Sequence, residues 1–137
     1  MSFVVDGSVA LAWCFIDEHT RPVMDLLDRV TETGAFAPLL WPLEALNGLL
    51  MAERRRRVDS GHRQRLAEFL RALPITLDSE TSERAWTTTA QLAEHHRLSA
   101  YDACYLELAL RRKLPLATLD RDLIKAAKAL GTTVLGT

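Results

Sequence analysis

The stretch Phe-Val-Val-Asp-Gly-Ser at residues 3–8 decides the fold of this chain. Its first half is a short apolar run of β-branched and aromatic residues, which predicts a buried strand. The Asp-Gly pair then predicts a turn, and Ser8 is the expected cap of a short helix that runs through Cys14. The other elements are placed from this pattern, in which a buried strand ends at an acid, Asp6, and turns into a helix.

The same pattern returns near the other end of the chain. Residues 116–119 form a short apolar run that predicts a strand, and Asp120 follows it directly at the start of a helix expected through Leu130. A closing strand is expected over residues 133–135, after Gly131. Both strands therefore place an aspartate at the point where the chain leaves the sheet.

Between these ends, strands alternate with helices. Helices are expected over residues 20–33, from Pro42 to the arginines at 54–57, over 61–73 with Asp59 or Ser60 as the cap, over 79–96, and from Ser99 to Arg112, with strands over 35–39 and 75–77. The alternation predicts an α/β fold with a short parallel sheet of about five strands flanked by helices. Because no repeat, low-complexity stretch or linker interrupts the chain, we expect a single domain over residues 1–137.

Composition is that of an ordinary globular protein, with 48% hydrophobic residues and a net charge of -1. It excludes disordered and fibrous classes, and the charge indicates neither a nucleic-acid nor a membrane partner. Cys14 and Cys104 lie far apart among apolar neighbours, as buried thiols do in a reducing compartment. Without a signal peptide or a membrane span in the sequence, the expected location is cytoplasmic and not membrane-bound.

Four acids are expected to share one edge of the sheet. In open parallel sheets, ligands bind outside the carboxyl ends of the strands. Asp6 and Asp120 follow strands directly, while Glu44 and Asp102 fall in the first turns of helices that can point their N-terminal ends at the same edge. Alone, each acid has a structural interpretation as a helix cap, a turn residue or a first-turn acid.

The surroundings of Glu44 and Asp102 favour a metal site over these structural roles. Both lie among apolar neighbours, where carboxylates are rarely buried without a partner. Two such charges about 4 Å apart repel by roughly 4 kcal/mol at an effective dielectric near 20, so the group needs a cation or shared protons. Because the donors are all oxygen, a hard cation is expected, Mg²⁺ or Mn²⁺ rather than Zn²⁺.

Four ordered motifs make the chain resemble the PIN-domain ribonucleases, and among them the VapC-type toxins of bacterial toxin-antitoxin pairs. The motifs are Val-Val-Asp6-Gly-Ser8, Pro42-Leu-Glu44-Ala-Leu-Asn47, Leu98-Ser-Ala-Tyr-Asp102-Ala-Cys-Tyr105 and Ala117-Thr118-Leu-Asp120. The resemblance implies a PIN-like fold and a Mg²⁺- or Mn²⁺-dependent endoribonuclease whose metal ligands are the four acids. It also implies an RNA substrate, a cognate antitoxin and a homodimer.

Further residues have both a supporting and a structural interpretation. Ser8 and Thr118 are expected to orient the carboxylates or a metal-bound water, although such hydroxyls often cap helices. Asn47 lies three residues after Glu44 and so shares its helical face, where it either reaches the site or is simply a surface residue. Asp122 is a possible extra acid, or a first-turn residue that favours the helix dipole.

Basic and aromatic residues also leave two interpretations open. Arg54, Arg55, Arg56 and Arg57 form the densest charge run, and either they and Lys125 bind RNA phosphates or they are solvated helix ends. Three tryptophans, at positions 13, 41 and 86, are either exposed anchors for a partner or, as the helical spacing favours, core residues.

Two other functions compete with a ribonuclease. One is a catalytically silent PIN-like module that binds RNA or protein. The other is a Mg²⁺-dependent phosphatase or phosphoacceptor domain, which the sequence weighs against because Ser8 stands where a haloacid-type phosphatase requires a second aspartate.

Overall fold

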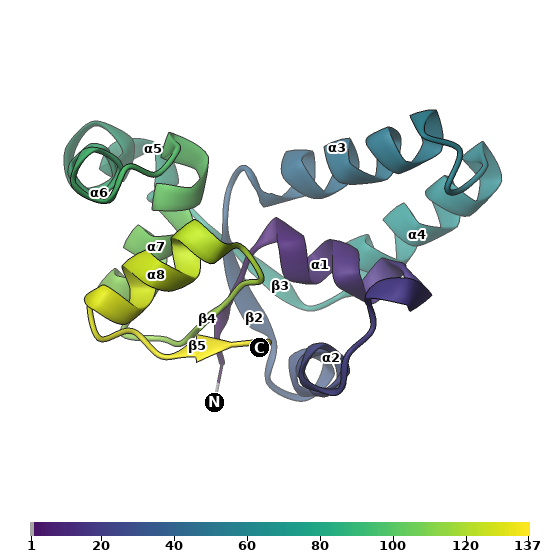
Figure 1. Cartoon of the computed structure of the whole chain (residues 1–137), viewed down its shortest axis with the longest axis horizontal. Coiled ribbons are helices and arrows are strands. Elements are labelled where there is room, and N and C mark those ends of the chain that lie inside the picture. The colour runs from purple at the N-terminus through teal and green to yellow at the C-terminus, as the bar shows by residue number, and fades with distance from the viewer. Residues whose placement is uncertain (1) are drawn as a thin grey trace.

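The computed structural model of the protein describes residues 2–137 and contains a sheet of five parallel strands (Figure 1). The strands are β1 (Val4–Val5), β2 (Ala35–Pro38), β3 (Ile75–Asp78), β4 (Leu116–Ala117) and β5 (Val134–Leu135). They lie in the order β3-β2-β1-β4-β5, with every pairing parallel. The predicted α/β fold with about five parallel strands is therefore confirmed.

The order of the strands puts β1 in the middle of the sheet. The chain builds β2 and then β3 on one side of β1, and later places β4 and β5 on the other side. Val4 pairs with Phe36 on one side and with Leu116 on the other. Asp6 and the residues that follow Ala117 thus leave neighbouring strands at the point where the chain reverses direction across the sheet, which is where open α/β sheets bind ligands.

Helices flank the sheet in two groups (Figure 1). The first group is α1 (Gly7–Cys14), α2 (Arg21–Thr33), α3 (Trp41–Arg54) and α4 (Ser60–Ala72), and the second is α5 (Thr81–Arg84), α6 (Ala90–His96), α7 (Ala100–Arg112) and α8 (Arg121–Ala129). In that view α3 and α4 stand on the right and α5 to α8 on the left. Within residues 2–137, none of the helices has the length and apolar character needed to cross a bilayer.

The helix expected over residues 79–96 is not one regular α-helix. A π-helical segment, Ala85–Thr89, separates α5 from α6. It contains three consecutive threonines, and β-branched residues have a low α-helix propensity. Trp86, in the wide turn, is 88% exposed. The expectation that this tryptophan packs into the core is therefore wrong, whereas Trp13 and Trp41 are buried.

Two other boundaries differ from the sequence-based expectation by more than one residue. The strand expected over residues 116–119 ends at Ala117, because the backbone N–H of Leu119 donates to the hydroxyl of Ser8 instead of continuing the ladder. Helix α3 ends at Arg54, and the three arginines after it form a turn in which Arg56 has a left-handed φ of 61°.

Helices α1 and α3 pack closely against each other next to the sheet. A β-carbon on Gly48 of α3 would collide with the side chain of Leu11 on α1, so the close approach requires glycine at this position. The packing matters for the site, because α1 begins directly after Asp6 and α3 carries Glu44 in its first turn. Both cysteines, Cys14 and Cys104, are buried and free, as the sequence predicts.

An ion network that the sequence does not reveal ties the edge strand β3 to α7. The Arg111 guanidinium donates from Nη2 to Asp78 Oδ2 at 2.7 Å, from Nε to Glu107 Oε2 at 2.9 Å, and from Nη1 to Glu80 Oε2 at 3.2 Å. Burial alone would raise the pKa of Asp78, but the hydrogen bonds and charge of Arg111 more than offset it and lower that pKa. Arg111 thus compensates two carboxylates that are almost fully buried.

Replacing Arg111 by methionine is expected to lower the free energy of unfolding by about 3–5 kcal/mol at pH 7, because it leaves the Asp78 and Glu107 charges buried without a cation. The measurement is urea unfolding, with Arg84→Met as control, because Arg84 pairs with Glu80 near the surface and such pairs contribute less than about 1 kcal/mol.

A depressed pKa stabilises the fold above the unfolded value of 3.8 and loses that effect as the pH falls through the folded value. The difference between wild type and Arg111→Met should therefore shrink in acid. Equal losses for the two variants at pH 7 would show that the network does not stabilise the fold.

Candidate functional site

Asp6 is a buried carboxylate held by three donors. It is 4% exposed and caps α1 by accepting from the backbone N–H of Val9 at 3.1 Å. The Ser8 hydroxyl donates to Oδ1 at 2.6 Å, and the Thr118 hydroxyl donates to Oδ2 at 2.5 Å. The expectation that Ser8 caps this helix is wrong, since Asp6 takes that role. A carboxylate has about four acceptor positions, so Asp6 keeps one for a further ligand.

The same two hydroxyls also bind the backbone that follows β4. Ser8 accepts from the N–H of Leu119 at 2.9 Å, and Thr118 accepts from the N–H of Asp120 at 3.1 Å. Each hydroxyl therefore joins the carboxylate at the end of β1 to the chain that leaves β4. These bonds fix where Asp6 and Asp120 lie relative to each other.

Glu44 reaches the same edge from the first turn of α3. Its Oε1 accepts a hydrogen bond from the Tyr105 hydroxyl of α7 at 3.0 Å. On its other side the carboxylate lies against Gly7, where an added β-carbon would stand 2.7 Å from Oε1. Glu44 therefore bridges the start of α1 and the middle of α7.

Asp102 and Asp120 both lie at helix N-termini. Ser99 caps α7 by accepting from the backbone N–H of Asp102 at 3.0 Å, so Asp102 sits in the first turn of that helix. Asp120 itself caps α8, where its Oδ2 accepts from the N–H of Leu123 at 2.9 Å. The capping role that the sequence suggested for Asp120 is thus present and occupies one of its two carboxylate oxygens.

The pKa shifts show that these acids act on one another. Burial is the largest cause that raises the pKa of Asp6, of Glu44 and of Asp102. The Asp102 charge raises the first two pKa values further, and the charges of Asp120 and Asp122 raise that of Asp102. No cation within residues 2–137 forms an ion pair with any of these acids.

The donor set fits a hard divalent cation. The carboxylates supply only oxygen, the donor that Mg²⁺ and Mn²⁺ prefer. Burial raises the pKa of the nearby Cys104 thiol, which donates to the backbone carbonyl of Tyr101. As placed, the side chains of residues 2–137 include no group of three or more His, Cys, Asp or Glu that would bind one ion directly. The acids therefore lie along the same edge of the sheet and repel one another, but they are not yet close enough to bind one ion together. A bound ion would have to draw them closer.

The other acid and the amide predicted near the site lie at its surface. Asp122 is exposed in the first turn of α8, close enough to Asp102 to raise its pKa. Asn47 is exposed on α3, one helical turn beyond Glu44. Both are open to solvent at the rim of the acidic edge.

The arginine run lies away from the acids. Arg54 follows Glu44 by ten residues along α3, which corresponds to about 15 Å of helix. Arg57 is engaged there, because its guanidinium pairs with Asp17 at 3.0 Å and lies over the Phe15 ring. A phosphate-binding role beside the acids is thus disfavoured for this run. Lys125 is exposed on α8, three residues after Asp122.

Two residues of the site were missed by sequence reasoning. Tyr105 lies three residues after Asp102 and so shares its helical face, a spacing that could have pointed to the site. The third motif ends at Tyr105, but no role in the site was predicted for this residue. Gly7 was assigned to a turn, yet it is the first residue of α1 and makes room for Glu44.

Comparisons with known proteins agree with this architecture. The family model described as the PIN domain matches residues 3–129. Among solved structures, the chain is similar to PAE2754 from Pyrobaculum aerophilum, with a TM-score of 0.71, 23% sequence identity, and coverage of 98% of this chain and 89% of that one. No curated protein gives a significant sequence match.

Two further similar structures carry related descriptions. FitAcB from Neisseria gonorrhoeae has a TM-score of 0.67 at 17% identity and covers 99% of this chain and 97% of that one. A structure described as FitAB bound to an IR36 DNA fragment has a TM-score of 0.66 at 16% identity, with coverage of 98% and 93%. At these identities the three structures show a shared fold.

Replacing Asp102 by asparagine is expected to stabilise the metal-free protein at pH 7 by on the order of 1 kcal/mol, because it removes a charge that burial and two neighbouring carboxylates disfavour. The measurement is urea unfolding in EDTA, with Asp25→Asn on the exposed side of α2 as control.

A raised pKa makes the metal-free protein lose stability as the pH rises from the unfolded value of 3.8 through the folded value. The increase in the free energy of unfolding caused by Asp102→Asn should therefore vanish near pH 3. A variant that is less stable than wild type at pH 7 would contradict the repulsion described above.

Proposed function

The chain belongs to the PIN-domain family, and from this premise we propose that it is a Mg²⁺- or Mn²⁺-dependent endoribonuclease that acts as the VapC-type toxin of a toxin-antitoxin pair. The observation that carries the proposal is the group of desolvated carboxylates, Asp6, Glu44 and Asp102, whose pKa values are raised by burial and by neighbouring acids. No cation of the described residues, 2–137, forms an ion pair with them. Such a group has a physical reason to bind a divalent ion.

Each acid has a distinct task in this proposal. Asp6, Glu44 and Asp102 would hold the ion, and Asp120 would add the oxygen that its capping bond leaves free. When bound, such a cation supplies Lewis-acid chemistry to a phosphodiester and lowers the pKa of a water for in-line attack. The hydroxyls of Ser8 and Thr118 keep the Asp6 carboxylate fixed in orientation.

The choice of RNA as substrate rests on the resemblance to VapC-type toxins. Exposed Lys125 and Asp122 flank the acidic edge on α8, where Lys125 is available for a phosphate contact. A cytoplasmic location is also part of the proposal, and the two free, buried cysteines agree with a reducing compartment.

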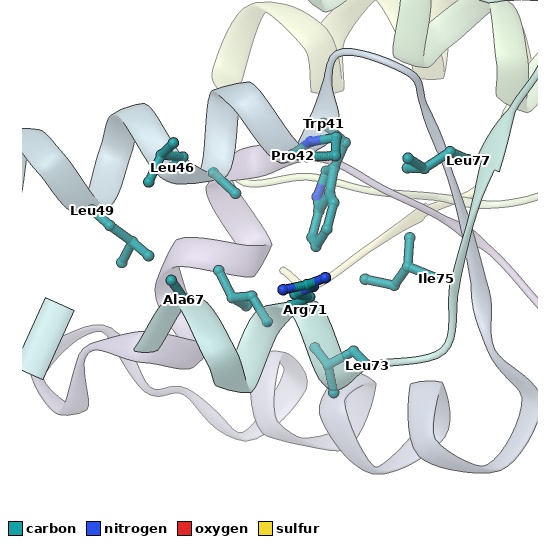
Figure 2. Close-up of a pocket in the computed structure, with 11 residues that line it drawn as sticks. Trp41, Pro42, Leu46, Leu49, Ala67, Arg71, Leu73, Ile75 and Leu77 are labelled. Atoms are coloured by element: carbon teal, nitrogen blue, oxygen red, sulfur yellow. The ribbon is translucent and has the colours of Figure 1, made fainter. Parts of the chain in front are cut away.

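An apolar groove supports the proposal of a cognate antitoxin. The groove, of about 430 Å³, lies between α3, α4 and β3 (Figure 2). Its lining is mostly apolar and includes Leu46, Leu49, Ile75 and Leu77. A segment with apolar side chains would bury this surface.

Two polar groups in the groove narrow the chemistry of that segment. The indole Nε1 of Trp41 is buried and has no hydrogen-bond partner within residues 2–137, so a segment that repacks this groove could supply the acceptor it lacks. The Arg71 guanidinium lines the same groove, where Figure 2 shows it below Trp41. An antitoxin segment is thus expected to carry an acidic residue opposite Arg71.

A homodimer is also part of the proposal. Large apolar side chains lie exposed on elements that surround the acidic edge, among them Leu43 at 71% and Tyr101 at 66%. The structure described as FitAB bound to DNA is consistent with a larger nucleic-acid-bound assembly, in which this chain would be the nuclease subunit.

Replacing Asp6 or Asp102 by asparagine is expected to abolish RNA cleavage and growth inhibition, a loss greater than the roughly 100-fold that follows removal of a residue supporting a metal ligand. The measurement maps RNA ends after expression with and without the product of the neighbouring gene. EDTA should stop cleavage by purified wild type, and Asp25→Asn should cleave normally.

The same assay distinguishes the competing functions. Tight RNA binding without cleavage in Mn²⁺ would show a silent PIN-like module. Activity that ignores EDTA, together with unfolding of the Asp6→Asn and Asp102→Asn variants, would show that the acids are structural. An acyl-phosphate trapped by reduction would indicate a phosphatase or phosphoacceptor domain.

Charge reversal in the groove, Arg71→Glu, is expected to weaken binding of the antitoxin by at least about tenfold, because the acidic residue opposite it would meet a like charge. Leu46→Asp, at the groove wall, should act in the same direction. The measurement is titration calorimetry with the neighbouring gene product. The control is Leu130→Asp, at the exposed C-terminal end of α8 and outside the groove lining. Unchanged affinity for both groove variants would place the antitoxin elsewhere.

A further inference from the structure

We propose that Tyr105 and Gly7 form a positioning pair for Glu44. Tyr105 holds one carboxylate oxygen of Glu44, Gly7 leaves room for it, and the other oxygen is thereby presented to a divalent cation. The inference rests on the metal site of the proposed function. It concerns residues of this chain that would not themselves touch the ion.

The hydroxyl of Tyr105 is a fixed point for Glu44. Its side chain is completely buried on α7, and a buried phenol needs a hydrogen-bond partner. The Glu44 Oε1 atom is that partner, at 3.0 Å. Because the phenol ring cannot move within its packed surroundings, the oxygen that accepts its bond is held in place as well.

Gly7 leaves the space that the same oxygen occupies. A β-carbon at this position would stand 2.7 Å from Glu44 Oε1, closer than atoms of this kind approach in proteins. Gly7 lies in a regular helix and is not among the glycines with a positive φ, so backbone conformation does not require glycine here. What a side chain at this position would meet is the Glu44 carboxylate, so a larger residue would displace Oε1 from its present place.

The two carboxylate oxygens of Glu44 therefore have different roles. Oε1 is engaged by Tyr105 and lies against Gly7, which leaves Oε2 as the oxygen free for a ligand. Tyr105 also lies one helical turn from Asp102, so α7 carries one acid and positions another. Without the hydroxyl, the Glu44 side chain would have to be ordered each time an ion binds.

Tyr105→Phe tests the role of the hydroxyl, because phenylalanine fills the same buried volume. The measurement is calorimetric titration of purified protein with Mn²⁺ alone. We expect binding to weaken by about tenfold, within the range for residues that support metal ligands. Tyr101→Phe is the matched control, since Tyr101 lies on the same helix, is 66% exposed and should leave the affinity unchanged. Gly7→Ala should weaken Mn²⁺ binding as well, because it displaces Oε1.

A double-mutant cycle separates positioning from a general loosening of the site. In a Glu44→Gln background, Tyr105→Phe should cause no further loss of Mn²⁺ affinity, because the carboxylate that it positions is gone. A further loss in that background, or a Tyr105→Phe affinity equal to wild type, would overturn the inference.

The two proposals also fail in different ways. Suppose that Tyr105→Phe weakens Mn²⁺ binding in wild type but not in the Glu44→Gln background, and that the protein cuts no RNA. This result would support the positioning pair and reject the ribonuclease. EDTA-sensitive cleavage of RNA with Mn²⁺ affinity indifferent to Tyr105 would support the ribonuclease and reject the positioning pair.

Discussion

The burial of the Asp6 carboxylate is the constraint on which the rest of this structure depends. A charge in that position is costly unless hydrogen bonds compensate it, and here the compensation comes from the start of α1 and from the end of β4. The Ser8 and Thr118 hydroxyls that supply two of these bonds also join the end of β1 to the end of β4, the neighbouring strands between which the sheet order changes direction. Fold and candidate site are therefore built by one set of interactions, centred on one side chain.

The protein contains a second group of buried acids, and the contrast between the two groups is informative. Asp78 and Glu107 are compensated within the chain by the Arg111 guanidinium, which lowers the pKa of Asp78. At the carboxyl edge of the sheet, by contrast, the pKa of Asp6 and that of Asp102 are raised, and among residues 2–137 no cation forms an ion pair with either acid. Within the described part of the chain, one buried acidic group has a cation partner and the other has none, which supports the proposal that the second takes its cation from solution.

Helix α3 connects the acidic edge with the apolar groove. Its first turn carries Glu44, while the groove is lined by Leu46 and Leu49 from the same helix. The close packing at Gly48 fixes α3 against α1, which begins at Asp6. The proposed metal site and the proposed antitoxin surface thus share a single rigid element.

Local sequence determined much of this protein by itself. A strand followed by an acid, a helix cap such as Ser99, and helical periodicity are properties of short stretches, so they predicted the five strands, most of the helices and the edge at which Asp6 and Asp120 lie. Only the tertiary structure decided which side chains meet. Tyr105 and Glu44 are 61 residues apart in the chain, and Arg111 and Asp78 are 33 apart. Contacts of this kind depend on how helices pack across a sheet, and no local pattern encodes that.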